Sequence, residues 1–121
     1  MTRASAAARR LDRTFSALAD PTRRGVIELL RERPRRAGEL AEACGASAPA
    51  MSRHLRVLRT RGLVAEEGVD DDARVRVYRL RREPFDALSL WLRELESFWS
   101  EQLESFGAHV ARRKAEAGRS R

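Results

Sequence analysis

The sequence predicts a mainly helical domain with one small β-hairpin, in the order helix, helix, helix, helix, strand, strand, helix. Three observations predict this fold. Apolar residues recur at helical spacing as far as about Leu58, two short alternating segments rich in valine follow, and a long stretch with aromatic residues at helical spacing comes last. The length of 121 residues is typical of one domain.

The first two helices are predicted on either side of an Asp20-Pro21 step. Asp20 is suited to cap a helix because its carboxylate accepts backbone N–H groups, and proline is tolerated at the first helical position. Before this step, apolar residues recur every three or four positions, at Leu11, Phe15 and Leu18. The second helix has three inward apolar residues, Val26, Ile27 and Leu30, and Pro34 ends it.

Two further helices follow, and a tight turn joins them. The third helix spans about residues 37–44, and Gly45 is suited to the left-handed conformation that often ends a helix. Ser47 is suited to cap the fourth helix, which runs to about Arg61, and Pro49 lies in its first turn. Two helices joined by about three residues that include a glycine form the helix-turn-helix arrangement.

A two-stranded hairpin, or wing, is predicted after this pair of helices. Residues 63–67 and 74–80 alternate moderately and contain β-branched and aromatic side chains. The sequence leaves open which alternate side chains face the core.

The last helix is predicted over about residues 85–114. The basic tail, residues 111–121, is expected to be disordered, which leaves residues 1–110 as the folded domain.

The chain is strongly basic, with a formal net charge of +7 and an isoelectric point of about 11.2. We expect attraction to polyanions, nucleic acid first and an acidic membrane surface second. Nearly every basic residue is arginine, so compositional bias is the alternative explanation. Cys44 is the only cysteine, which excludes an intrachain disulfide and favours a reducing cytosol. No apolar run reaches the roughly 18–20 residues of a membrane span, so we expect a cytoplasmic protein, which would be nucleoid-associated if the polyanion is DNA.

The fourth helix has two different faces. Ala48, Met51, Leu55 and Leu58 fall on one side, as core residues do, whereas Arg53 and Arg56 fall on the other among small residues. Small residues let a helix enter the major groove of DNA, where arginine can bond guanine bidentately. An ordinary solvated arginine face is the alternative. The predicted DNA contacts, including two in the hairpin, are Ser47, Pro49, Ala50, Ser52, Arg53, Arg56, Arg74 and Arg76.

Three segments together resemble one known family. They read "FSALADPTRRGVIELL", "GELAEACGASAPAMSRHLRVLRTRGLV" and "VRVYRL", and they are similar to the ArsR/SmtB family of bacterial winged-helix transcriptional repressors. The resemblance covers about residues 11–110. It implies a homodimer whose fourth helices enter successive major grooves of double-stranded DNA, with the wing on the flanking backbone. It also implies a small-molecule inducer of unidentified chemistry, and whether this chain has one stays open.

The chain departs from the metal sensors of that family. Those sensors carry a Cys-x-Cys motif on the third helix, where this sequence has Arg36, Ala37 and Gly38. The other common metal site uses Asp, His, His and Glu on the last helix, where this sequence offers scattered glutamates and one His109. We therefore expect no metal and no cofactor, and we interpret Cys44 as a core residue rather than a redox sensor.

The wing tip is acidic. Three consecutive aspartates, residues 70–72, would repel phosphate, so either the tip points away from DNA or only the hairpin arginines reach the backbone. A cation bound by these aspartates is the less favoured interpretation of the tip.

A dimer is expected from the apolar surface of the first and last helices. Large aromatic side chains of this kind are enriched in interfaces, although packing of the last helix onto the first within one chain is an alternative. The predicted interface residues are Leu11, Phe15, Trp91, Leu95, Phe98, Trp99 and Phe106.

Two classes of function remain after the sequence is read. The favoured one is a sequence-specific DNA-binding regulator, a homodimeric repressor of a pseudo-palindromic operator. The alternative is a winged-helix module that binds an acidic protein partner. An enzyme is not expected, because the sequence has no Gly-rich phosphate loop and no nucleophile–base pair.

Overall fold

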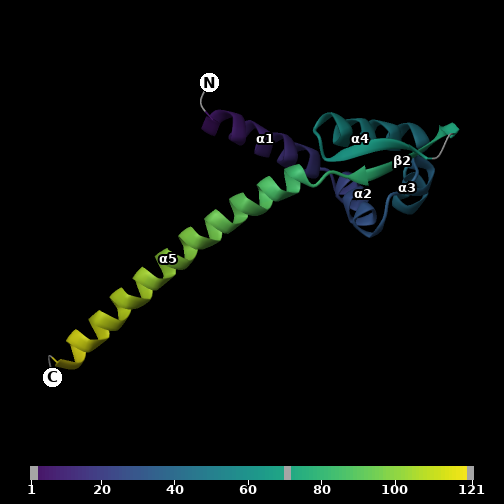
Figure 1. The fold of residues 1–121 in the computed structure, drawn as a ribbon. Coiled ribbons are helices and arrows are strands. Elements are labelled where there is room, and N and C mark those ends of the chain that lie inside the picture. Colours follow the sequence, from purple (N-terminus) through teal and green to yellow (C-terminus); the bar gives the residue numbers. More distant parts are fainter. Residues whose placement is uncertain (1–2, 70–71, 120–121) are drawn as a thin grey trace. The chain divides into compact units, whose positions relative to one another are not determined.

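The computed structural model describes residues 3–69 and 72–119 (Figure 1). The elements are α1 (Arg3–Leu18), α2 (Pro21–Glu32), α3 (Ala37–Cys44), α4 (Ala48–Thr60), β1 (Val64–Val69), β2 (Asp72–Leu80) and α5 (Glu83–Arg119). The predicted fold class and element order are confirmed. The chain forms two compact units, Met1–Leu88 and Ser89–Arg121, and the second unit consists of α5 beyond its first turns. None of the helices described is long and apolar enough to cross a membrane.

Three helix caps predicted from the local sequence, at Asp20, Gly45 and Ser47, are confirmed. The Asp20 carboxylate caps α2, accepting the backbone N–H groups of Thr22 at 2.8 Å and Arg23 at 3.1 Å. The Ser47 hydroxyl oxygen caps α4 by accepting the Ala50 N–H at 3.2 Å. Gly45 ends α3 in the left-handed conformation, at a φ of 64°, where a side chain would be strained.

Two features differ from the expectation. The last helix continues through Arg119 instead of ending near Lys114, so the tail expected to be disordered is helical over residues 111–119. This stretch is rich in alanine and arginine, which are strong helix formers. The second difference is a β-bridge between Arg35 and Tyr78, with N–H to O distances of 3.1 and 2.8 Å, which gives β2 an additional backbone partner on the segment before α3.

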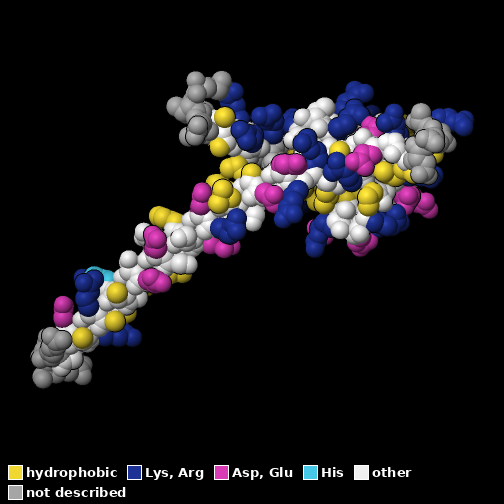
Figure 2. Space-filling model, in the orientation of Figure 1, with side chains coloured by type: hydrophobic (Ala, Val, Ile, Leu, Met, Phe, Trp, Pro, Cys, Tyr) yellow, Lys and Arg dark blue, Asp and Glu magenta, His cyan; other side chains and the backbone are white. Residues whose placement is uncertain are grey.

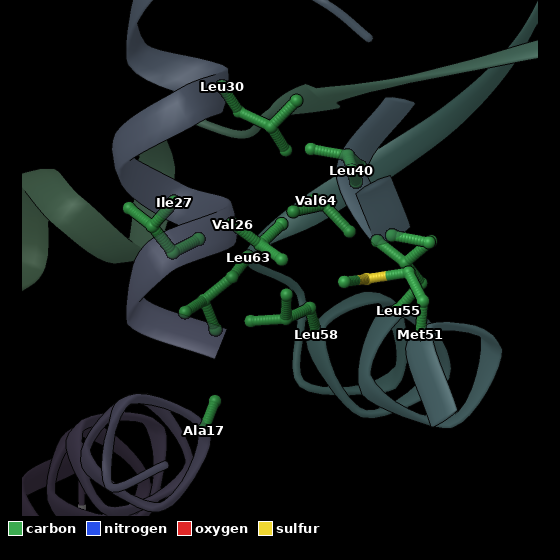
Figure 3. Close-up of a cluster of buried hydrophobic side chains, with 11 residues drawn as sticks. Ala17, Val26, Ile27, Leu30, Leu40, Met51, Leu55, Leu58, Leu63 and Val64 are labelled. Carbon is green, nitrogen blue, oxygen red and sulfur yellow. The ribbon is translucent and has the colours of Figure 1, made fainter. Parts of the chain in front are cut away.

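The hydrophobic core lies between α2, α3, α4 and β1 (Figure 3). Its buried residues are Ala17, Val26, Ile27, Leu30, Leu40, Ala41, Met51, Leu55, Leu58, Leu63 and Val64. The strands pair in an antiparallel register that places Val64 opposite Leu80 and Glu66 opposite Tyr78. Val64 is buried, and Tyr78 and Leu80 pack against the core, so these residues mark the side of the hairpin that faces the core.

Arginines of α2 cap the end of α1. The Arg23 side chain donates to the carbonyl oxygens of Ala17 at 2.7 Å and Ser16 at 3.2 Å, and Arg24 donates to Leu18 O at 2.7 Å. These carbonyls belong to the last turn of α1, where carbonyl oxygens have no N–H partner within the helix. The arginines that follow Asp20-Pro21 therefore join α1 to α2.

The same junction reaches α4 through His54. Its Nδ1 lies 3.5 Å from Arg23 Nη1 and 3.9 Å from Asp20 Oδ1. The pKa of Asp20 lies below its ordinary value, chiefly because the carboxylate accepts the Arg23 N–H. The Thr22 N–H, His54 and the Arg23 charge act in the same direction, while partial desolvation opposes them. Asp20 thus caps α2 and also lies close to His54 of α4.

We predict that Asp20→Asn removes part of the acid sensitivity of the fold. A lowered folded-state pKa means that the ionised carboxylate stabilises the fold above the unfolded-state pKa, and that this contribution is lost as pH falls through the folded-state pKa. Asparagine keeps the cap but not the charge. The variant should melt at a lower temperature than the native chain at neutral pH, and the difference should shrink below the ordinary pKa of 3.8.

The measurement is thermal unfolding by circular dichroism at one protein concentration across this pH range. The pKa of Glu39 is also lowered, mainly by the hydrogen bond from Arg33, but Glu39 is present in both chains and cancels in the comparison. A melting difference that stays constant down to acid pH would contradict the prediction.

Candidate nucleic-acid interface

Helix α4 buries one side and exposes the other. Met51, Leu55 and Leu58 are at most 2% exposed, whereas Arg53 and Arg56 are exposed. One predicted inward residue differs, because Ala48 is exposed at the first turn of the helix. Figure 2 shows arginine side chains, in dark blue, over α1 and α4 in that view. The arginines of α4 therefore project from a helix that is anchored from behind.

The three arginines within α4 differ in their pairing. Arg59 donates to Glu66 Oε2 at 2.6 Å, so its charge is already matched within the chain. Arg53 and Arg56 make no hydrogen bond or ion pair with any residue in the described ranges. Their guanidinium groups are open to an external partner, and their planar forks suit a base edge or a phosphate.

The start of α4 presents small side chains beside these arginines. Ser47, Pro49 and Ser52 are exposed and Ala50 is half-buried. The Ser47 oxygen accepts the cap bond, which leaves its O–H free to donate to a phosphate. Because none of these side chains is bulky, a duplex can approach the N-terminal half of the helix closely.

The hairpin arginines have acidic neighbours on β1. Arg76 Nε lies 3.7 Å from Glu66 Oε1, and Arg79 is paired with Glu67. Arg74 is exposed and interacts within the chain. Asp70 and Asp71 of the acidic tip lie outside the described residues, so the tip itself stays a prediction.

Sequence reasoning missed the role of Glu66. This carboxylate is 23% exposed and lies between Arg59 of α4 and Arg76 of β2, so it links the helix to the hairpin. It also faces Tyr78, whose pKa is raised by burial first and by the Glu66 charge second. The hairpin register places Glu66 opposite Tyr78 and diagonal to Arg76, where side chains on one face are neighbours, but the sequence alone does not give that register.

The residues considered for metal or redox chemistry take structural positions. Cys44 is half-buried, packs against the core, and has a pKa raised by burial, which favours the unreactive thiol. Arg36 is the residue before α3, and its backbone N–H donates to Glu39 at 3.3 Å. In residues 3–69 and 72–119 there is no group of three histidine, cysteine or acidic residues placed to hold a metal ion.

The residues predicted for the dimer interface carry a large exposed apolar surface. Leu11 is half-buried, and the others are exposed in the single chain: Phe15, Trp91, Leu95, Phe98, Trp99 and Phe106. Phe98 and Trp99 meet edge to face, with ring centroids 6.0 Å apart.

A winged helix-turn-helix with a basic, outward-facing helix places this chain in the class of DNA-binding proteins. Comparison with known proteins identifies the family. The model of bacterial regulatory proteins of the ArsR family matches residues 20–66. The HTH-type transcriptional regulator Rv2034 of Mycobacterium tuberculosis is 39% identical over 95 residues, which cover 78% of this chain and 83% of that protein. The chain therefore belongs to the ArsR family of DNA-binding transcriptional regulators, which are not enzymes.

Other relatives extend this likeness. The transcriptional repressor SdpR of Bacillus subtilis is 34% identical over 56 residues, 46% of this chain and 62% of SdpR. An ArsR-like regulator from Rhodococcus sp. RHA1 has a TM-score of 0.72 at 26% identity, covering 91% of this chain and 96% of that one. The homodimeric winged helix-turn-helix domain of Mb0332 from Mycobacterium bovis has a TM-score of 0.62 at 26% identity, covering 86% and 91%.

We predict that Glu66→Gln strengthens DNA binding roughly two- to fivefold, as expected for one partly exposed charge. The substitution removes a negative charge beside Arg59 and Arg76 and leaves both guanidinium groups available to phosphate. The measurement is a fluorescence-anisotropy titration with duplex DNA at several salt concentrations, and the variant should show the steeper salt dependence.

Glu67→Gln is the matched control, because it removes the same charge from the adjacent position, where the carboxylate pairs with Arg79 instead. Equal gains in affinity from both substitutions would show that general charge, not the position of Glu66, controls the effect.

Proposed function

We propose that this regulator is a homodimeric repressor that reads a pseudo-palindromic operator through the helix at residues 47–61. The observation that carries the proposal is the exposed pair Arg53 and Arg56, which have no partner among residues 3–69 and 72–119 and are held outward by three buried apolar residues on the opposite side of α4. Ser47, Pro49, Ala50 and Ser52 supply the small surface beside the arginines, and Arg74 and Arg76 contact the flanking backbone.

Two findings support the homodimer and the repressor role. A structural neighbour, the Mycobacterium bovis domain, is homodimeric, and a sequence relative, SdpR, is a transcriptional repressor. The apolar stripe of α5 is the kind of surface that a second copy covers, and two-fold symmetry matches a pseudo-palindrome with half-sites about one helical turn apart. Residues 1–110 are then the DNA-binding and dimerisation domain, followed by a basic tail at 111–121.

The regulator belongs, in this proposal, to the branch of the family that does not sense metals. Arg36, Ala37 and Gly38 stand where metal sensors have a thiolate pair, and arginine repels cations. We place the protein on the nucleoid, with a small-molecule inducer as its regulator and no cofactor.

We predict that Arg53→Ala and Arg56→Ala each weaken operator binding by about 1–3 kcal/mol where the residue reads a base. The operator is selected from genomic DNA by the purified protein, and affinity is measured against scrambled competitor. Arg93→Ala is the matched control, because Arg93 lies on the polar side of α5 and loses the same charge.

Unchanged affinity in both variants would refute the assignment of the recognition helix. No preference for the selected sequence over competitor would favour the alternative, a module that binds an acidic protein partner.

We predict that the native chain is a dimer by size exclusion with light scattering, and that Trp99→Glu shifts it toward the monomer. Trp99 is 57% exposed in the single chain, and a charge at the centre of an apolar interface is costly to bury. Ser100→Glu introduces the same charge on the polar side of α5 and should leave the dimer intact. A native chain that stays monomeric at micromolar concentration would overturn the homodimer.

A further inference from the structure

A cationic hollow lies away from the arginines of the proposed DNA-binding face. Its volume is about 370 Å³, and it lies between α1, the turn after α4 and the start of α5. Four arginines line it, Arg10 and Arg13 from α1, Arg61 from the turn, and Arg81 from the segment before α5, with Glu83 as the one lining carboxylate. All of these residues belong to the unit Met1–Leu88.

Backbone and side-chain bonds hold two of the four arginines in place. The Arg81 N–H donates to Leu63 O at 2.9 Å, which ties this segment to the core end of β1. Arg61 Nη1 donates to Ser16 Oγ at 3.2 Å, which ties the end of α4 to α1. The hollow is therefore built from segments that are fixed against one another.

The charges around the hollow are poorly matched. Arg81 Nε lies 3.7 Å from Glu83 Oε2, which is a loose pair. Arg10 and Arg13 make no ion pair with any residue in the described ranges. Four guanidinium groups and one carboxylate leave three positive charges facing one small space, and like charges gathered in this way favour a bound anion.

The size and the donors indicate the class of ligand. A hollow of this volume falls at the lower end of the range for small-molecule sites. Guanidinium forks match the geometry of phosphate and carboxylate groups and bond them bidentately. Gly62, at a φ of 83°, and Pro84 add little bulk or polarity, so the anionic group would dominate recognition.

We propose that this hollow is the binding site of a small anion that carries phosphate or carboxylate groups. Through its contacts with α1, the end of α4 and the start of α5, the anion acts as the effector of the regulator. Only this regulatory consequence rests on the proposed function, because binding itself requires no DNA. By linkage, an anion that lowers operator affinity is itself bound less tightly by the DNA complex.

A phosphate of DNA is the other source of the same chemistry, and the position of the hollow argues against it. Arg61 is eight residues beyond Arg53, which is about 12 Å further along the axis of α4. Arg61 also lies about 140° around the helix axis from Arg56, since successive residues turn by about 100°. A duplex seated on the arginines of α4 therefore leaves the hollow open to a small molecule.

The test is isothermal titration calorimetry of the full chain, without DNA, against inorganic pyrophosphate and against succinate at constant ionic strength. The native chain should bind at least one of the two, and Arg13→Gln and Arg81→Gln should each weaken binding at least tenfold. Arg93→Gln, which removes the same charge from the polar side of α5, should bind as the native chain does.

Three outcomes would overturn the proposal. The first is that neither probe binds the native chain. The second is that all three variants bind the probe equally, which would indicate a general response to charge. The third is that Arg13→Gln and Arg81→Gln, without any added anion, weaken operator binding as strongly as Arg53→Ala does, which would show that the hollow binds DNA. Because the calorimetry contains no DNA, a failure of operator recognition would leave its result intact, and the two proposals fail separately.

Discussion

The one-sided burial of α4 is the constraint on which the rest of the structure depends. Met51, Leu55 and Leu58 are buried against α2, α3 and β1, and each such side chain contributes about 1.5–3 kcal/mol by leaving water. Any rotation of α4 that buried its arginines would expose these three residues and desolvate charges as well. The outward direction of Arg53 and Arg56 is therefore a consequence of the core.

The position of α4 relative to α1 and α2 also depends on a set of polar contacts. Asp20 Oδ1 caps α2 and also lies near His54 Nδ1 of α4, while Arg23 caps α1 through Nε and Nη2 and approaches His54 with Nη1. Parts of two of the three segments that carry the family resemblance, "ALADPTRR" and "SRHLRVL", thus lie close together. Helix capping at this junction explains the aspartate and the arginine, because an aspartate accepts N–H groups at a helix start and an arginine donates to carbonyl oxygens at a helix end.

Local features of the sequence predicted the local structure well. Asp20, Gly45 and Ser47 act through bonds to residues at most four positions away, so their roles follow from sequence spacing alone. The Arg35–Tyr78 bridge and the Arg59–Glu66 pair join distant segments, and no spacing rule finds them before the fold is known. For the site, the arginines of α4 could be selected from helical periodicity, whereas the hollow near Arg81 is assembled from three separate elements.

The distribution of charge separates the basic residues into distinct groups. On the hairpin, Glu66 and Glu67 pair with Arg76 and Arg79, and Arg31, Arg33 and Arg35, at and just after the end of α2, each have an acidic partner nearby in sequence. Arg53 and Arg56 on α4, and Arg10 and Arg13 beside the hollow, have no acidic partner among the residues that the structure describes. The two pairs differ in setting, because the first is exposed along a helix and the second lines a hollow. The first setting favours a long polyanion, and the second favours a small anion.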